Sequence, residues 1–238
     1  MEANITIILA TYNRPDTLRV AIESVLYQTY PAWKLLVIGD HCDEHTEEVV
    51  HSFGDARITY INMPVRSGEQ SGPNSVGIAL ADTAYLAFLN HDDVWLQDHL
   101  AYGLKTLRES GADFFVGKSA FASFYVDMVQ TQQWPTFEMM HHDNRHPRQT
   151  FNRDDLRNFE PASAWLLRSE VAKNVGYWRG RDDVLDVAPI QDWVRRAWRQ
   201  QAEFVFGSQL SVLKINTKQS PFSETKTGIY NYVSPVHT

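Results

Sequence analysis

Short apolar runs alternate along the first half of the chain with longer segments whose apolar residues recur every three or four positions. The first run, Ile5 to Leu9, predicts a strand, and the segment 15–28 predicts an amphipathic helix. Pro15 suits the first turn of that helix, where its missing N–H would have no partner. The alternation continues with three further pairs, each a strand followed by a helix. The strands are expected at 34–39, 58–62 and 85–89, and the helices after them at 44–52, 74–81 and 97–110. This order indicates an α/β fold, with a Rossmann-like, mostly parallel sheet flanked by helices.

The pattern loosens after about residue 112. A further strand is expected at 114–117, followed by an aromatic and β-branched stretch at 121–129 and a polar stretch at 130–158. We expect this second half to be rich in strands and loops and to pack on the same sheet. The Ser-, Thr- and Pro-containing tail from residue 217 is expected to be an extension.

Polar residues follow several of the predicted strands directly. Asn13-Arg14, Asp40-His41 and Asp92-Asp93 each come just after a strand's carboxyl end. In parallel α/β sheets, ligands bind outside the carboxyl ends of the strands. These clusters are therefore expected to meet at one edge of the sheet.

The composition limits the classes of partner. With 43% hydrophobic residues the chain can fill a core, and its net charge of -7 argues against a broad nucleic-acid surface. The single cysteine, Cys42, excludes an internal disulfide and fits a reducing compartment. We find no apolar run long enough to span a bilayer and no signal-type amino terminus, so a cytoplasmic location is expected. Peripheral contact with a membrane remains open, as does the oligomeric state.

The acidic positions have a structural interpretation beside a chemical one. Asp92 and Asp93 follow a buried apolar run, where they form either a cation site or the acidic start of the next helix. Asp192 lies on a helix that begins near residue 190, opposite its apolar face. It either points into a cleft or pairs with Arg195 or Arg196 along the helix. In the same way, Asp40 either contacts a ligand or caps the helix near residue 44, and Tyr12 could be a core aromatic.

A family resemblance is carried by four segments in order. They read ITIILATYNRPDTLRVAIESVLYQTYPAWKLLVIGD, GPNSVGIALADTAYLAFLNHDDVW, EPASAWLLRSEVAKNVGYW and IQDWVRRAW. Together they resemble the family-2 glycosyltransferases with the GT-A fold. The resemblance implies transfer of a sugar from a nucleotide diphosphate donor, a UDP-sugar first, to a carbohydrate or glycoconjugate acceptor. It also implies help from a divalent metal, Mn²⁺ or Mg²⁺.

The resemblance further implies roles for particular residues. Contacts with the nucleotide sugar are implied for Thr11, Tyr12, Arg14, Asp40, Asn74 and Asp92. Asp93 resembles the metal ligand of a DXD-type motif, with Asp92 as a second ligand or a partner of sugar and ribose hydroxyls. Such a cation would neutralise the charge on the departing diphosphate. Asp192 resembles the general base of an ED-type motif, and direct attack would invert the anomeric configuration.

Several positions depart from the family pattern. Gly39 stands where many relatives carry an acidic residue, which leaves the donor base open. Pro73 stands where a basic residue is common, so Arg66 or the metal alone would neutralise the pyrophosphate. Lys214 and Asn216 are nearest to the place of a metal- or phosphate-contacting His, so weak metal affinity is expected.

Two other functions remain open. The departures, with Asn90 in place of a frequent aspartate, are compatible with a nucleotide-sugar-binding module that has lost catalysis. A sugar nucleotidyltransferase-like enzyme would need a glycine-rich phosphate loop after the first strand, and ATYNRPDT contains no glycine.

For each of these functions we expect a single domain over 1–238. It would comprise a nucleotide-sugar-binding half at 1–110, an acceptor and catalytic-base half at 111–216, and an extension at 217–238.

Overall fold

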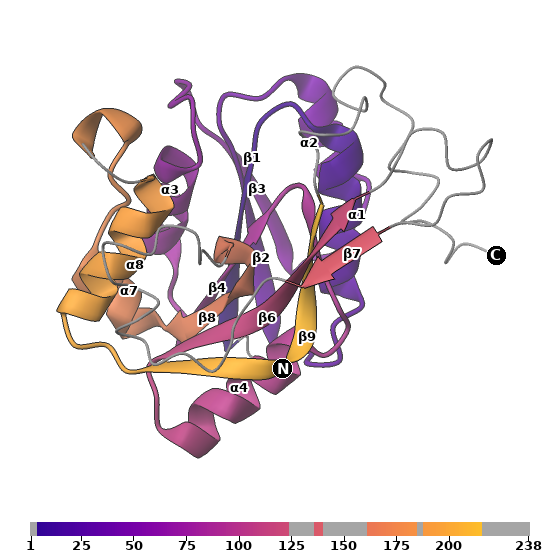
Figure 1. The fold of residues 1–238 in the computed structure, drawn as a ribbon. Coiled ribbons are helices and arrows are strands. Elements are labelled where there is room, and N and C mark those ends of the chain that lie inside the picture. The colour runs from indigo at the N-terminus through magenta and orange to yellow at the C-terminus, as the bar shows by residue number, and fades with distance from the viewer. Residues whose placement is uncertain (1–3, 124–135, 140–160, 185–187, 216–238) are drawn as a thin grey trace.

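One strongly curved sheet organises the molecule (Figure 1). The computed structural model describes residues 4–123, 136–139, 161–184 and 188–215. Its strands are β1 Ile5–Thr11, β2 Trp33–Gly39, β3 Ile58–Asn62, β4 Tyr85–Asn90, β5 Asp93–Trp95, β6 Phe114–Ser123, β7 Thr136–Met139, β8 Trp165–Arg168 and β9 Phe204–Ile215. Its α-helices are α1 Pro15–Leu26, α2 Glu44–His51, α3 Ser71–Leu80, α4 His99–Ser110, α7 Ser169–Val175 and α8 Pro189–Arg199.

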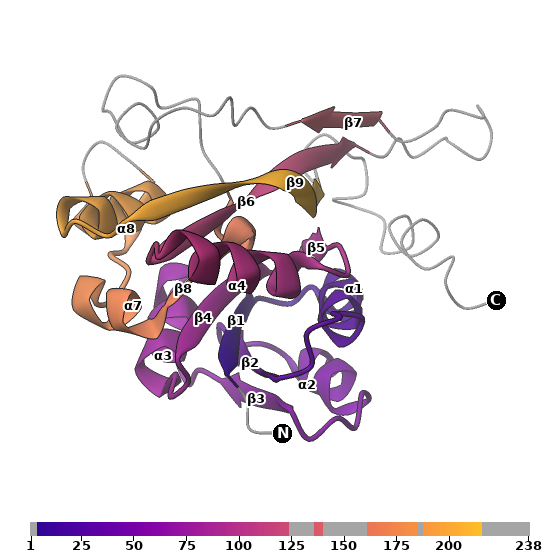
Figure 2. The same ribbon diagram turned by 90° about the horizontal axis from the view of Figure 1, so that it is seen from below.

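The amino-terminal part of the sheet is parallel. Strand β1 pairs with β2 on one side and with β4 on the other, and β3 pairs with β2, all in parallel. Helices α1 and α2 lie on one side of these strands, and α3, α7 and α8 lie on the other (Figure 2). The predicted α/β class and the predicted order of strands and helices are confirmed.

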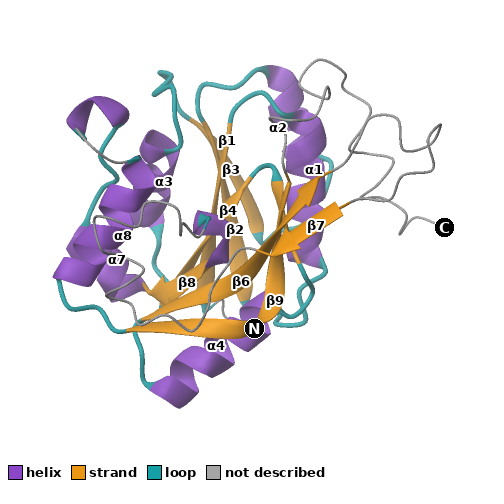
Figure 3. Cartoon of the chain, in the orientation of Figure 1, coloured by secondary structure: helices purple, strands orange, loops and turns teal. Residues whose placement is uncertain are grey.

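The rest of the sheet is mixed. Strand β8 lies antiparallel between β4 and β6, and β9 runs parallel to β6 and antiparallel to β5 (Figure 3). The short strand β5 was not predicted, and β6 is longer than the expected segment 114–117. Only residues 121–123 of the stretch 121–129 are described, and only 136–139 of the polar stretch 130–158, where they form β7. The tail from 217 lies outside the described residues. In the part that is described, no helix has the length and apolar content to cross a bilayer.

A cluster of aromatic rings fills the core between the sheet and α8. Trp193 of α8 stacks on Trp165 of β8 with ring centroids 5.9 Å apart and on Trp178 at 5.5 Å. Phe88 of β4 meets Trp193 edge-on at 5.7 Å, and Phe114 of β6 meets Trp165 at 5.5 Å. Stacked and edge-on pairs of this kind stabilise beyond their buried area. These three tryptophans are therefore core residues, and they fix α8 against the sheet.

Candidate functional site

The polar segments after β1, β2 and β4 meet at one edge of the sheet. In the parallel register Thr11 lies opposite Gly39 and Ala10 lies opposite Asn90, so the three strands end together. Asn13, with φ 43°, and His41, with φ 59°, turn the chain through the left-handed region there. The convergence predicted from the sequence is confirmed.

A pocket of about 160 Å³ opens at this edge. It is lined by Ala10, Thr11, Tyr12, Asp40, Arg66, Gly68, Glu69, Gln70, Pro73 and His91. Three predicted donor residues are among them. The sequence reasoning assigned no role to His91 or to the loop residues 68–70. The Gly- and Ser-containing segment between β3 and α3, which leaves the sheet at the same edge, was the signal that could have found the loop.

Asp40 holds the loop after β3 in place. Its carboxylate is 3% exposed and accepts hydrogen bonds from the backbone N–H of Ser67 at 2.6 Å, the Ser67 hydroxyl at 2.8 Å and the Gly68 N–H at 2.9 Å. The alternative that Asp40 caps α2 is wrong, because the capping side chain is Asp43, which accepts from Thr46 N–H at 3.1 Å. Asp40 therefore shapes one wall of the pocket.

Tyr12 and Arg66 form a flat cationic face in the pocket. The Arg66 guanidinium lies 3.9 Å from the centre of the Tyr12 ring, which is a cation–π contact. The backbone N–H of Tyr12 donates to Nδ1 of His91 at 3.4 Å. Burial, followed by the positive charges of Arg14 and Lys214, lowers the pKa of His91 to about 4, so this imidazole is neutral at physiological pH.

Thr11 carries an unsatisfied polar atom at the pocket wall. The residue is 2% exposed, and its Oγ1 finds no hydrogen-bond partner among the described residues. A buried hydroxyl without a partner costs about 1–3 kcal/mol, a cost that a ligand could remove. Because Thr11 lines the pocket, this hydroxyl favours a polar ligand there.

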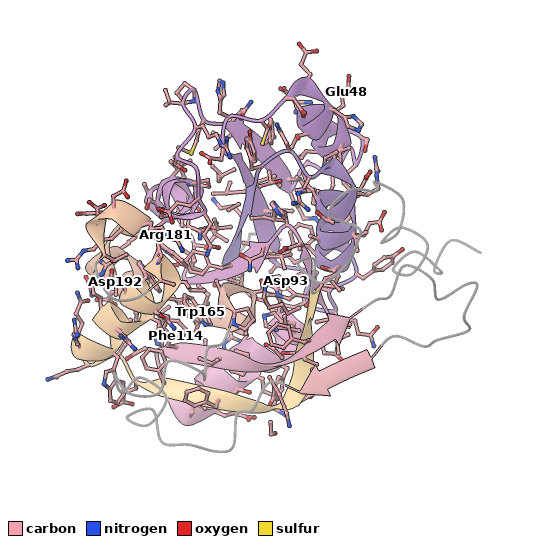
Figure 4. All side chains as sticks on the ribbon, turned by 45° about the horizontal axis from the view of Figure 1, so that its top comes forward. Glu48, Asp93, Phe114, Trp165, Arg181 and Asp192 are labelled. Atoms are coloured by element: carbon pink, nitrogen blue, oxygen red, sulfur yellow. The ribbon has the colours of Figure 1, made fainter. Side chains whose placement is uncertain are left out.

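Asp93 is buried at the start of β5 (Figure 4). It has no exposed surface and accepts hydrogen bonds from the Ser163 hydroxyl at 2.5 Å and the Asn90 amide at 2.9 Å. The Lys214 ammonium lies 3.4 Å from its other oxygen. Burial raises the pKa of the Asp93 carboxyl, and Lys214 opposes that effect. The acidic-helix-start alternative is wrong for Asp93, which lies in β5, before α4 begins at His99.

Asp92 is the more accessible of the two neighbouring carboxylates. It is half-buried, whereas Asp93 is enclosed. Within the described residues no group of three or more His, Cys, Asp or Glu side chains could hold a metal ion. One accessible carboxylate fits Mg²⁺ or Mn²⁺ only if donor phosphates and water supply most of the ligands, which is a common mode for Mg²⁺.

Arg14 and Asn74, the remaining predicted donor residues, are not among the described residues that line the pocket. Arg14 is exposed just before α1, and its charge reaches His91. Asn74 is 2% exposed in the first half of α3, next to Pro73, which does line the pocket.

Asp192, the predicted general base, is paired with arginines. It is 7% exposed, and its oxygens lie 2.8 Å from Nε of Arg196 and 3.4 Å from Nη1 of Arg179. Arg196 also donates to the carbonyl of Val175, the last residue of α7, at 2.6 Å and to that of Tyr177 at 2.7 Å. The pairing with Arg196 that the sequence left open is therefore present, in addition to any chemical role.

Comparison with solved structures places the fold. Staphylococcus aureus TarS in complex with UDP-GlcNAc matches with a TM-score of 0.69 and 16% identity, over 94% of this chain and 61% of that chain. The mannosyltransferase PcManGT from Pyrobaculum calidifontis, in complex with GDP-Man and Mn²⁺, matches with a TM-score of 0.63 and 13% identity, over 92% of this chain and 59% of that chain. At such identities the likeness shows the shared fold alone.

Sequence comparison identifies relatives among bacterial transferases. The Escherichia coli UDP-Glc:alpha-D-GlcNAc-diphosphoundecaprenol beta-1,3-glucosyltransferase WfgD is 31% identical over 113 residues, which cover 48% of this chain and 44% of WfgD. The putative teichuronic acid biosynthesis glycosyltransferase TuaG of Bacillus subtilis is 29% identical over 121 residues, 50% of this chain and 48% of TuaG. The chain therefore matches slightly less than half the length of these relatives. The model of glycosyl transferase family 2 matches residues 6–176, well over half of the 238 residues, and the protein belongs to that family.

Proposed function

We propose that this chain binds a nucleotide diphosphate sugar in the pocket and transfers the sugar to a hydroxyl of a carbohydrate or glycoconjugate acceptor. The observation that carries the proposal is the unsatisfied Thr11 hydroxyl in a pocket that also presents the Tyr12 ring and the Arg66 guanidinium. The aromatic face suits a nucleotide base, the cation suits a diphosphate, and the buried polar atom suits a sugar hydroxyl. Family membership supports the same reaction.

The donor is best explained as a UDP-sugar. The relative WfgD is by name a UDP-Glc-dependent glucosyltransferase. Tyr12 would offer its ring to the base and Asp40 would hold the pocket wall, with Asn74 supporting it. Arg14 and Arg66 would face the diphosphate, because guanidinium groups match phosphate geometry. Asp92 would bind sugar or ribose hydroxyls.

Charge on the departing diphosphate must be neutralised during transfer. During transfer a divalent cation, when one is bound with the donor, would contribute to this as a Lewis acid, and Asp92 is the residue that would hold it. Asp93 would position Asp92, because the hydrogen bonds that Asp93 accepts from Asn90 and Ser163 fix the turn that carries Asp92. This arrangement gives the enclosed Asp93 a positioning role rather than the first place among metal ligands.

Asp192 is the proposed general base. An acceptor hydroxyl within hydrogen-bond reach of its carboxylate would pass its proton to Asp192 while the oxygen attacks the anomeric carbon. A single displacement of this kind inverts the anomeric configuration. Arg196 and Arg179 would hold the carboxylate in one orientation. The role comes from the sequence resemblance, since the family match ends at residue 176.

The relatives support a proposal for the class of acceptor and for the location of the reaction. The acceptor named for WfgD is a GlcNAc-diphosphoundecaprenol, a glycoconjugate, and we propose an acceptor of this broad class. We further propose action on the cytoplasmic side, with residues 1–110 binding the donor and residues 111–216 binding the acceptor. A binding module without catalysis remains the second candidate, because both oxygens of Asp192 are paired with arginines.

Calorimetry with UDP, GDP, dTDP and CDP tests the donor site. We expect UDP to bind. Thr11→Val should weaken the affinity for UDP about fivefold, because one hydrogen bond of about 1 kcal/mol is lost. Thr59→Val is the matched control, because Thr59 is exposed on β3. Asp192→Asn should bind UDP normally and lose transfer. Absence of binding by all four nucleotides would refute the proposal, and full turnover by Asp192→Asn would refute the assignment of the base.

A further inference from the structure

A lysine lies at the pair of aspartates. Strand β5 pairs with β9 so that Lys214 stands directly opposite Asp93, although the two residues are far apart in the sequence. The ammonium lies 3.4 Å from Asp93 Oδ1, and the lysine side chain remains 25% exposed. The positive charge is therefore fixed at the aspartate turn and still reachable from solvent.

Lys214 is not needed merely to satisfy Asp93. The Asp93 carboxylate already accepts hydrogen bonds from the Ser163 hydroxyl and the Asn90 amide through its other oxygen. An ammonium has three N–H donors, and within the described residues its one hydrogen-bond partner is Asp93. The remaining N–H groups are available for an anionic ligand.

The turn that Lys214 contacts adjoins the pocket. His91, which directly precedes Asp92 in the chain, lines the pocket wall, and so does Arg66, a second positive group. The geometry therefore puts the Lys214 charge at a turn that borders the proposed donor site.

We propose that the Lys214 ammonium, held by Asp93, supplies the positive charge that faces the donor diphosphate, so that nucleoside diphosphate binding needs no divalent cation. The inference rests on the proposed function and adds a binding residue to it. The ammonium offsets one of the two negative charges of the aspartate pair and repels an incoming cation, while it attracts phosphate oxygens. The described residues, with one accessible carboxylate beside a lysine, suit an anion better than a tightly held metal.

Calorimetry of UDP binding in EDTA and in Mn²⁺ tests the inference. We expect the affinity of the unmodified protein to agree within about threefold between the two conditions. Lys214→Met should lose on the order of tenfold in EDTA, the effect of losing a hydrogen bond to a charged group, and should regain affinity when Mn²⁺ is added. Lys214→Arg should keep binding in EDTA, because it keeps the charge.

Two controls separate charge from folding. Lys105→Met removes an exposed lysine of α4 and should bind UDP as the unmodified protein does. The double variant Lys214→Met with Asp93→Asn avoids an unpaired buried carboxylate and should still bind poorly in EDTA. Thermal unfolding of each variant reports whether it is folded.

The outcomes are distinguishable. Binding by the unmodified protein only in Mn²⁺ would overturn the inference and leave the proposed function intact. Equal affinities of Lys214→Met and the unmodified protein in EDTA would also overturn it. Absence of nucleotide binding under both conditions would overturn the inference together with the proposed function.

Discussion

A buried histidine beneath the candidate site should make the protein's stability depend on pH. His99 begins α4, has no exposed surface and stacks on Trp95 with ring centroids 4.5 Å apart. Its Nδ1 lies 3.0 Å from the Ser211 hydroxyl, while Nε2 has no partner among the described residues. Burial lowers the pKa of His99 to about 3, so the imidazole is neutral in the folded protein.

The sign and size of the effect follow from proton linkage. The pKa of an unfolded histidine is about 6.5, so between about pH 6.5 and 3 the unfolded chain binds a proton that the folded chain does not. Stability is fully present above pH 6.5 and is lost as the pH falls toward 3. The slope is about 1.4 kcal/mol per pH unit, which amounts to about 2 kcal/mol between pH 7.5 and 5.

Urea unfolding followed by tryptophan fluorescence measures this loss. His99→Phe cannot take up the proton, so its free energy of unfolding should fall by about 2 kcal/mol less than that of the unmodified protein between pH 7.5 and 5. The variant leaves the Ser211 hydroxyl unpaired and should be less stable at pH 7.5, so the test compares the two pH dependences. His51→Gln, which removes an exposed histidine of α2, is the control. Parallel curves for His99→Phe and the unmodified protein would refute the reasoning.

Two further substitutions test the packing that holds the site. Gly77→Ala should destabilise by about 1–3 kcal/mol in urea unfolding, because the added Cβ would lie 2.5 Å from Ile8 Cγ2. In an Ile8→Ala background, which removes every Ile8 carbon that the new Cβ would meet, Gly77→Ala should destabilise less. A Gly77→Ala protein as stable as the original would contradict that contact. Arg196→Met should lower the free energy of unfolding by about 3 kcal/mol, because it leaves the buried Asp192 with a weaker partner. A double-mutant cycle with Asp192→Asn should show that the two substitutions are energetically coupled. Additive free energies in that cycle would mean that the ion pair contributes nothing.

The part of the site built by parallel strands could be predicted from the sequence. Uninterrupted apolar runs such as Tyr85 to Leu89 identify buried strands, and Pro15 stands at the first position of α1 as expected. Once the strands are known to be parallel, the positions of Asp40 and the 91–93 turn at one edge follow without further information. Local pattern and a general topological rule were sufficient there.

The environment of the aspartate pair could not be predicted in the same way. Strand β5 has three residues, too few to show a period of two, and its partner Lys214 comes from the far end of the chain. Only that pairing turns Asp93 inward, since successive strand residues face opposite sides. The hydrogen bonds of Asp40 could not be predicted for a similar reason. Its partners Ser67 and Gly68 belong to a loop, and no periodic pattern in the sequence predicts the path of a loop.

The aromatic cluster explains how the two proposed chemical sites can act together. Phe88 lies on β4 two residues before Asn90, and Trp193 directly follows Asp192 on α8. Their ring centroids are 5.7 Å apart, so one layer of buried rings connects the donor edge to the helix that carries the proposed base. Transfer requires the acceptor oxygen and the sugar carbon to be held within a narrow range of distance and angle, and rigid supporting residues serve that need. Trp165, Trp178 and Trp193 therefore contribute to the proposed reaction by fixing α8, although their rings are buried and unavailable to a sugar.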